Sequence, residues 1–393
     1  MTEAPSLHIA PPPFLDDPAL QAVLAALPTA RLVGGAVRDA IAGRPVSDID
    51  LATPDPPESV IRALDQSGLK HAPTGLQHGT VTAISQGRGF EVTTLRTDER
   101  TDGRHAEVAW TTNWQQDAAR RDFTINAMSM RPDGAVFDYF GGLPDLHAGR
   151  LRFVGDPARR IQEDYLRVLR FFRFYARYAA HPPDAATTHA LRHAAPALPR
   201  LSTERVWSEL KRILATPDPV QAVSLMDELG ILEVILPGAK DLAAFTRLVQ
   251  AGAPPDPLLR LTALYPAAPD LAEPLKLSRP EAQTLAALAG SPPDPAWSAA
   301  DLRRALTASS PAALVGRTWL QPQSPEWAAL RARIAATTPP VFPLHGRDAL
   351  ALGIPPGPDI GLALEAVRHW WLEGGCVADA TACRAQLATG LAR

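Results

Sequence analysis

The sequence predicts an α+β protein, with an N-terminal region of strands and helices followed by a longer region of helices alone. Between Arg31 and about Arg152, short apolar and β-branched runs are separated by glycines and polar turns, as is typical of strands. From Gly155 onward, apolar residues instead recur every three or four positions, and proline-rich breaks separate the segments. A chain of 393 residues is also too long for one ordinary core, so we expect several domains.

The elements follow in order along the chain. A proline-rich leader and a short amphipathic helix, DPALQAVLAAL, precede the first strand. Strands are predicted in the runs RLVGGAVRD, SDIDLAT, TVTAIS, FEVTTL, FTINAMSM and AVFDYF, with helices at Val37–Ala42 and Pro57–Ser67. In the helical region the prolines fall between periodic segments, so we expect them to cap and separate helices. The predicted parts are residues 1–30, 31–152, 153–215, 216–335 and 336–393.

Composition excludes several classes of protein. Apolar residues make up 46% and charged residues 21% of the chain, as in globular proteins, and no apolar run approaches the eighteen or so residues that span a bilayer. The N-terminal sequence lacks the three regions of a secretory signal, and Cys376 and Cys383 are the only cysteines. We therefore expect a cytoplasmic protein with no disulfide and no membrane partner.

Positive charge is concentrated in one part of the chain. The formal net charge is -3, but residues 150–212 contain thirteen Lys or Arg against six Asp or Glu. Almost all of these basic residues are arginine, which pairs with phosphate through two hydrogen bonds and stacks on bases. The concentration indicates a surface that follows nucleic-acid phosphates, with a solvated helix face as the alternative.

The first motif combines a glycine turn with two acids. Gly34 and Gly35 separate an apolar strand from a helix start, where glycine lets backbone N–H groups approach phosphates and Arg38 adds positive charge. Ten residues later, Asp48 and Asp50 are predicted at alternate positions of a strand, with both carboxylates on one face. Such a pair can hold two hard cations that activate a hydroxyl and neutralise a leaving pyrophosphate. A turn followed by solvent-exposed aspartates is the alternative.

The second motif, DAARRDFTINA at residues 117–127, places a basic pair beside an acid and ends in a polar amide. Arg121, Asp122 and Asn126 offer groups for phosphate and for ribose hydroxyls. Phe123 and Ile125 are predicted to be core residues. Alone, the run could equally be a surface ion-pair cluster.

The third motif, IQEDYLRVLRFFR at residues 161–173, is predicted to be one amphipathic helix with Asp164, Arg167 and Arg170 on a shared face. Cytosine and adenine both place an exocyclic amino donor beside a ring-nitrogen acceptor, so an Asp acceptor next to an Arg donor fits both bases. Guanine and uracil present a carbonyl beside an N–H and would leave the pair unsatisfied. Salt bridges on a solvated helix are the alternative.

Together, GGAVRD, SDIDLAT, RRDFTINA and EDYLRVLR resemble the signature blocks of bacterial tRNA nucleotidyltransferases and poly(A) polymerases. The resemblance implies a mixed-sheet nucleotidyltransferase head (31–152) that is followed by an all-α neck (153–215), body (216–335) and tail (336–393). It implies template-independent addition of CMP, with AMP left open, to the tRNA 3′ end. The implied cofactor is Mg²⁺, and the partners are CTP, ATP and the acceptor end and TΨC arm of tRNA, with no obligate protein partner.

The resemblance also implies roles for single residues. Asp48 and Asp50 would be metal ligands, and Glu91 is the candidate for a third catalytic carboxylate, although it could equally be structural. Asp164 and Arg167 would read C and A, Arg170 and Arg173 would serve phosphates, and the tail would contact tRNA. The implied nucleotide-binding residues are Gly34, Gly35, Arg38, Arg121, Asp122, Asn126, Asp164, Arg167, Arg170 and Arg173.

The segment Thr97–Val108 departs from the family pattern. The run DGRH at 102–105 is kept, but the tyrosine and the proline of the pattern are absent. In the family this segment takes part in the switch from C to A, and its loss accompanies enzymes that add only the two cytidines. Addition of CC alone and addition of full CCA therefore both stay open, with poly(A) polymerase as a further alternative.

Two other classes are weighed against this interpretation. A non-catalytic RNA-binding protein with the same fold would not need Asp48 and Asp50. A nucleotidyltransferase that modifies a protein or small molecule would not need the arginine-rich segment 150–212.

Overall fold

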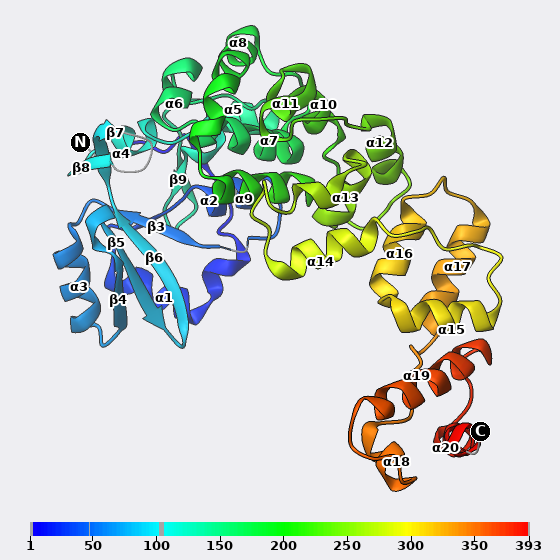
Figure 1. Ribbon diagram of the computed structural model, residues 1–393. Helices are drawn as coiled ribbons and strands as arrows, with labels where there is room; N and C mark the ends of the chain where they lie inside the picture. The colour runs from blue at the N-terminus through cyan, green and yellow to red at the C-terminus, as the bar shows by residue number, and fades with distance from the viewer. Residues whose placement is uncertain (1–2, 47, 102–105, 392–393) are drawn as a thin grey trace. The chain divides into compact units, whose positions relative to one another are not determined.

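The computed structural model describes residues 3–46, 48–101 and 106–391, which fall into two compact units, Met1–Gly238 and Ala239–Arg393. The first unit begins with strands and continues as helices, and the second is helical (Figure 1). Within the described residues, the last strand of the sheet ends at Phe137, before the helical region. The predicted α+β class is confirmed.

The first unit is built on an eight-stranded mixed sheet in the order β1-β10-β9-β2-β3-β6-β5-β4. β3 and β6 pair in parallel, whereas the other described neighbours in this sheet are antiparallel. The strands are β1 (Leu7–His8), β2 (Arg31–Val33), β3 (Asp50–Thr53), β4 (Lys70–Gly75), β5 (Thr80–Ser85), β6 (Arg88–Thr94), β9 (Ser129–Met130) and β10 (Ala135–Phe137). A separate antiparallel pair is formed by β7 (Arg96–Thr101) and β8 (Ala106–Trp110). Residues 102–105, with the DGRH run, lie outside the described residues.

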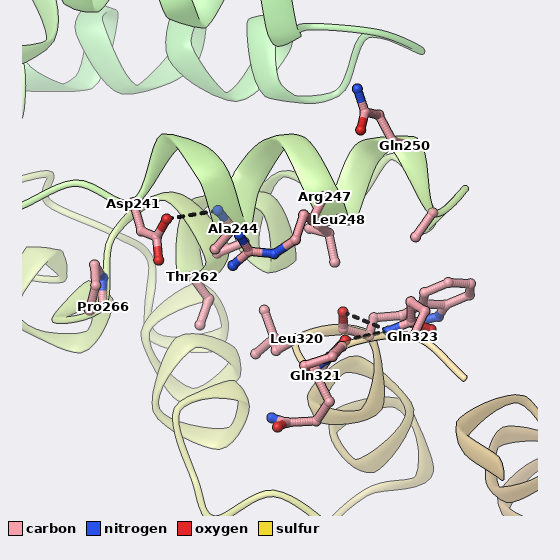
Figure 2. Close-up of a pocket in the computed structure, with 14 residues that line it drawn as sticks. Asp241, Ala244, Arg247, Leu248, Gln250, Thr262, Pro266, Leu320, Gln321 and Gln323 are labelled. Atoms are coloured by element: carbon pink, nitrogen blue, oxygen red, sulfur yellow. Dashed lines mark hydrogen bonds between the residues drawn. The ribbon is translucent and has the colours of Figure 1, made fainter. Parts of the chain in front are cut away.

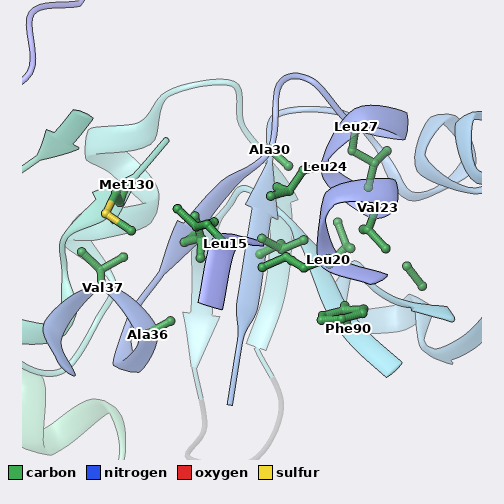
Figure 3. Close-up of a cluster of buried hydrophobic side chains, with 14 of the residues drawn as sticks. Leu15, Leu20, Val23, Leu24, Leu27, Ala30, Ala36, Val37, Phe90 and Met130 are labelled. Atoms are coloured by element: carbon green, nitrogen blue, oxygen red, sulfur yellow. The ribbon is translucent and has the colours of Figure 1, made fainter. Parts of the chain in front are cut away.

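A hydrophobic core holds this sheet against its helices. The helices α1 (Pro18–Ala26) and α3 (Pro57–Gln66) both pack against β5. Figure 3 shows side chains of α1 gathered with Phe90 of β6, and Val37 of α2 (Gly35–Ile41) belongs to the same buried cluster. Each fully buried side chain of this kind contributes about 1.5–3 kcal/mol to folding. The core therefore fixes β2, β3 and β6, beside which the glycine and acidic residues of the first motif lie.

The run FTINAMSM was predicted as a strand, and this is wrong for its first half. Thr124–Asn126 form a 3₁₀ turn, η3, and only Ser129–Met130 join the sheet. Thr124 N–H donates to the carbonyl of Arg152 at 3.0 Å, so the backbone here bonds to a distant loop instead of a neighbouring strand. Phe123 and Ile125 are buried, as predicted.

The helices of the first unit pack around α7. α7 (Leu166–Tyr178) lies against α9 (Thr203–Leu214) and α10 (Val220–Glu228). Phe174 of α7 meets Phe123 of the head, with ring centroids 5.2 Å apart. The remaining helical segments are α4 (Trp114–Ala119), α5 (Gly142–His147), α6 (Pro157–Glu163), α8 (Ala185–Ala194) and α11 (Ile231–Ile235), with 3₁₀ turns η1 (Pro13–Asp16), η2 (Leu76–His78) and η4 (Ala195–Arg200).

The second unit consists of helices with proline or a capping residue at many of their starts. In α13, Asp256 caps the helix by accepting the Leu259 N–H at 2.7 Å, and Pro257 occupies the first turn. The same Asp-Pro start begins α1 and α6, so the prediction that prolines cap and separate helices is confirmed. The helical segments are α12 (Leu242–Gln250), α13 (Pro257–Leu264), η5 (Ala268–Leu271), α14 (Arg279–Leu288), α15 (Ala299–Ala308), α16 (Pro311–Trp319), α17 (Pro325–Ala336), α18 (Gly346–Ala351), α19 (Pro358–Glu373) and α20 (Ala380–Leu391).

A cavity of about 530 Å³ lies in the second unit between α12, α13 and the loop after α16 (Figure 2). Gln323 lines it, and its amide nitrogen donates to the carbonyls of Thr318, Trp319 and Gln321. This side chain therefore holds its own loop together.

Within the described part of the chain, no helix has both the length and the apolar character required to cross a bilayer. Both cysteines are buried and free.

Candidate active site

The acidic strands end beside the glycine turn. In the sheet register, Val33 of β2 pairs with Asp50 of β3, and Asp50 pairs with Glu91 of β6. Directly paired residues point their side chains to the same face of a sheet, so Asp50 and Glu91 are neighbours on one face. Asp48 lies outside β3, which begins at Asp50, so its predicted position on the strand is wrong. The reason is that β2 ends at Val33 and offers no partner to residues before Asp50.

The acids repel one another. Asp50 is exposed at the start of β3, but the protein around it partly desolvates its carboxylate and so raises its pKa. Repulsion from Glu91 and Asp48 raises the pKa further, and Arg121 opposes the increase. Carboxylate oxygens that repel one another at an accessible surface are a donor set that suits a hard divalent cation, because the cation removes the repulsion. Within the described residues, no group of three or more His, Cys, Asp or Glu side chains has the arrangement of a metal site.

The glycine turn depends on Gly34. Its φ of +64° lies in the left-handed region, which side-chain-bearing residues rarely adopt. A Cβ at this position would also lie 3.2 Å from Nη1 of Arg121. Arg121 therefore reaches the turn, and it also influences Asp50. The structure thus brings together Gly34, Arg121 and Asp50, as the first two motifs predict.

Arg121 is held in place by a carboxylate that sequence reasoning missed. Asp117 of α4 is buried and pairs with Arg120 at 2.8 Å and with Arg121 at 3.2 Å. Burial acts to raise the pKa of Asp117, but Arg121 and Arg120 outweigh it and lower the pKa. The sequence did indicate this pairing, because Asp117 precedes Arg120 by three residues and Arg121 by four, a spacing that brings side chains together on one helical turn.

Arg38 lies at the centre of a buried network. It pairs with Asp39 at 2.8 Å, and its Nη1 donates to the side-chain oxygen of Asn126. The hydroxyl of Tyr178 donates to Asp39 at 2.7 Å. Burial acts to raise the pKa of Asp39, but hydrogen bonds from Arg38 and Tyr178 lower it. Asp39 and Tyr178 therefore orient Arg38, a role that the sequence alone did not reveal.

Asp122 continues this network towards α7. Its Oδ1 accepts the Asn126 amide N–H at 3.1 Å, and its Oδ2 accepts the Arg170 Nε–H at 2.9 Å. Burial acts to raise the pKa of Asp122, but Arg170 and Asn126 outweigh it and lower the pKa. Arg170 is thus placed against a head-domain carboxylate, and its predicted role towards phosphate stays a prediction.

The third motif is not one helix. α6 ends at Glu163, Asp164 adopts an extended conformation, and α7 begins at Leu166. The prediction that Asp164 shares a helix with Arg167 and Arg170 is therefore wrong. The break has a local cause, because Asp164 Oδ1 accepts the Leu166 N–H at 3.0 Å and so competes with helix hydrogen bonding. Because of this hydrogen bond, the Asp164 side chain lies beside the start of α7.

Asp164 and Arg167 are each held in place by another side chain. Asp164 Oδ2 accepts an N–H of Arg205 from α9 at 2.8 Å. Arg167 pairs with Glu163, which also pairs with Arg160 at 2.8 Å. Sequence reasoning missed Arg205 as a partner because 41 residues separate it from Asp164.

Arg173 points to another carboxylate. It pairs with Glu209 of α9 at 2.8 Å, and Glu209 is almost completely buried. Its predicted role towards phosphate also stays a prediction. Gly35 begins α2, and a Cβ there would lie 3.6 Å from Nη2 of Arg38, so this glycine is in ordinary contact range of the network.

Comparison with known proteins identifies the class first. Residues 30–152 match the family model described as the poly(A) polymerase head domain. Residues 183–242 match a second model, described as the probable RNA and SrmB-binding site of polymerase A. The first match lies within the first unit and contains the glycine turn, the acids and the RRD run. The second begins in the first unit and ends in the second, at residue 242.

Full-length relatives then give the family. The chain is 36% identical over 367 residues to the CCA tRNA nucleotidyltransferase 1, mitochondrial, of Mus musculus, which covers 88% of this chain and 83% of the relative. It is 34% identical to the CCA-adding enzyme of Geobacillus stearothermophilus, over 86% of this chain and 87% of that enzyme. A crystal structure of the Bacillus stearothermophilus CCA-adding enzyme with CTP matches with a TM-score of 0.74 and 26% identity, covering 96% of this chain and 98% of that structure. The chain belongs to the CCA-adding tRNA nucleotidyltransferase family of the poly(A) polymerase superfamily. Enzymes of this family are generally metal-dependent.

Proposed function

We propose that the protein adds C, C and A to the 3′ end of tRNA from CTP and ATP, without a nucleic-acid template. One observation carries the proposal: the sheet register places Asp50 beside Glu91 and next to the glycine turn, with Arg121 close to both features. A nucleotidyl transfer needs this combination of metal-holding carboxylates and positive groups for a triphosphate.

The chemistry is an in-line attack of the RNA 3′-hydroxyl on the α-phosphate, which releases pyrophosphate. Asp48 and Asp50 would hold Mg²⁺, which would activate the hydroxyl and neutralise charge on the leaving group. Arg121 stabilises the triphosphate beside the glycine turn. Gly34 has no side chain there, so the turn leaves room for the Arg121 guanidinium. Arg38 is fixed in orientation by Asp39 and Asn126, so it contributes positive charge at a defined place.

Base selection is proposed for Asp164 and Arg167. Asp164 is fixed by Arg205 and by the start of α7, and Arg167 is fixed by Glu163. Groups that are held in this way lose little entropy when a base binds, and they penalise a base whose donors and acceptors do not match. Asp122, Asn126, Arg170 and Arg173 are proposed to support the nucleotide from the network between the head and α7.

Three finer points belong to the proposal. The identity of the cation as Mg²⁺ is supported by the oxygen-rich donor set. A cytoplasmic location is tested by cell fractionation, since a relative named above is a mitochondrial enzyme by its name. Assignment to the bacterial branch of the family is tested by a phylogeny, since the relatives come from an animal and a bacterium.

Full CCA addition is favoured over CC addition and over poly(A) synthesis, because the two relatives are named as a CCA tRNA nucleotidyltransferase and a CCA-adding enzyme. The test is to incubate the protein with Mg²⁺ and a tRNA that lacks its last three nucleotides, with CTP, ATP or both. Growth by two nucleotides with CTP and by three only when ATP is added supports the proposal. Growth that stops at two with both nucleotides would indicate a CC-adding enzyme, a long A tail would indicate a poly(A) polymerase, and no growth would contradict the proposal altogether.

A further inference from the structure

A basic pocket lies at the C-terminal ends of α2, α7 and α9 in the first unit. We name it the Tyr178 pocket. Its volume of about 800 Å³ is within the range of ordinary ligand sites. Its charged and aromatic lining includes Arg44, Arg177, Arg212 and Tyr178, none of which has a role in the proposed chemistry except that Tyr178 orients Asp39. Arg38 and Arg173 also line it.

The charge of this pocket is distributed by depth. Arg38 and Arg173 form its inner part, with side chains 8% and 24% exposed, and each pairs with a carboxylate at 2.8 Å. Arg44 and Arg177 are exposed, and so is Arg212, which shares Glu209 with Arg173. The inner arginines are therefore neutralised by the protein. At the mouth, the exposed Arg44, Arg177 and Arg212 outnumber the one exposed carboxylate of the lining, Asp218, so positive charge is in excess there.

Three guanidinium groups surround the ring of Tyr178. The guanidinium carbons of Arg38, Arg44 and Arg177 lie 4.4, 4.6 and 5.6 Å from its centroid. Cation–π attraction offsets part of the repulsion among these like charges. Arg44 is also held at the mouth by a hydrogen bond from its Nη1 to the carbonyl of Arg177, at 2.9 Å.

This arrangement selects the kind of ligand. A nucleobase cannot stack on the Tyr178 ring without displacing guanidinium groups, whereas an anion at the mouth would relieve their repulsion. Burial lowers the pKa of Arg173, and the charges of Arg170 and Arg212 act in the same direction, against Glu209. The planar, multi-donor guanidinium suits a phosphate group in particular.

The position along α7 separates the pocket from base reading. Arg177 follows Arg167 by ten residues, which corresponds to about 15 Å along a helix. A polynucleotide carries phosphates along its length, so it can occupy a site at the far end of α7 while its 3′ end meets the nucleotide. We propose that the Tyr178 pocket binds a backbone phosphate of the RNA substrate, with Arg44 and Arg177 as its main ligands. This inference rests on the proposed function.

The experiment measures RNA binding and nucleotide use separately. The variant Arg44→Gln/Arg177→Gln is compared with Arg62→Gln/Arg192→Gln, which removes two exposed arginines of the same unit outside the pocket. Binding of labelled tRNA lacking CCA is followed by fluorescence anisotropy over a series of salt concentrations, and KM for CTP is measured at saturating tRNA. Arg44→Lys/Arg177→Lys restores charge without the planar fork, and thermal unfolding checks that every variant is folded.

We expect the Gln variant to bind tRNA about tenfold more weakly than the control, with a salt slope reduced by roughly one and an unchanged KM for CTP. The Lys variant should recover part of the affinity. Unchanged tRNA affinity and salt slope would overturn the inference, and so would a raised KM for CTP without weaker tRNA binding, since the phosphate would then belong to the nucleotide. If the wild-type protein binds tRNA but never extends it, the proposed function fails while this binding test still decides the pocket.

Discussion

Asp50, at the acidic end of the sheet, combines a stability cost with its proposed function. The pKa of Asp50 is raised by burial and by Glu91, so its charged form is disfavoured in the folded protein. A group whose folded pKa is raised binds a proton more readily in the folded state, so the destabilisation appears as pH rises through the folded pKa and persists at pH 7. Active-site carboxylates commonly carry such a cost, because function requires them close together.

Asp50→Asn should therefore abolish activity without harming the fold. We expect incorporation of CMP to fall by roughly a thousandfold or more, because the cation loses a ligand. In the absence of metal, Tm at pH 7 should equal or exceed that of the wild type. Addition of Mg²⁺ should raise Tm of the wild type and of the control Asp16→Asn, but not that of Asp50→Asn. Retained incorporation would remove Asp50 from the metal assignment.

Arg205 holds Asp164 through a 2.8 Å hydrogen bond, so we propose that it positions Asp164 for base selection. Arg205→Ala should increase incorporation of UMP and GMP relative to CMP by about tenfold, which corresponds to 1.4 kcal/mol of lost discrimination. Arg205→Lys should restore part of it, and Arg200→Ala, which removes an exposed arginine nearby, should leave selectivity unchanged. A purely structural role would lower kcat for every nucleotide equally, and that result would contradict this prediction.

At the scale of elements, the sequence predicted those features that depend on local patterns. Burial alternates throughout the strand Thr80–Ser85 and from Gly89 onward in Arg88–Thr94, and α1 has both its cap and its proline in the sequence. The failures come from side chains that compete with backbone hydrogen bonds. Asp164 breaks a helix that periodicity predicts to be continuous, and Thr124 bonds to Arg152 across the fold. The spacing of apolar residues predicts neither of these hydrogen bonds.

The attachment of α7 to the head is expected to depend on pH. The pKa of Asp122 is lowered from 3.8, despite burial, by Arg170 and Asn126. A lowered folded pKa contributes stability that is present above the unfolded value and is lost as pH falls through the folded value. Wild-type stability, measured by urea unfolding, should therefore hold down to about pH 5 and then decrease. Asp122→Asn should cost about 3 kcal/mol at pH 7, since Arg170 loses its partner, and should show a smaller further loss between pH 5 and 3. Identical pH profiles would mean that another group controls acid unfolding.

At the scale of the whole molecule, the motifs predicted which residues gather but not how they are held. The three motifs lie far apart in the sequence, and the structure brings Gly34, Arg121 and Asp50 together through the sheet register. The supporting partners, such as Asp39, Asp117 and Arg205, act through tertiary contacts that a single sequence does not specify. The Tyr178 pocket has the same origin, because Arg44 and Arg177 are separated by 133 residues.

The division of labour along the chain predicts a separable role for residues 336–393. Their helices have a buried cluster of their own, which includes Trp371 and Cys383. From α15, Arg303 donates to the carbonyl of Gly375, and Arg304 donates to the carbonyls of Leu372 and Glu373. A chain that ends at Thr337 exposes the guanidinium groups of Arg303 and Arg304 to water, which costs little for arginines that are already partly exposed.

We therefore expect the shortened chain to fold and to extend saturating tRNA at close to the wild-type rate, while KM for tRNA rises about tenfold. An RNA duplex with the acceptor stem but without the TΨC arm should be extended equally well by both proteins, because the contact that is lost would be to the arm. If KM rises equally for the duplex and the tRNA, the tail does not recognise the TΨC arm. If KM for tRNA is unchanged, residues 338–393 do not bind the substrate.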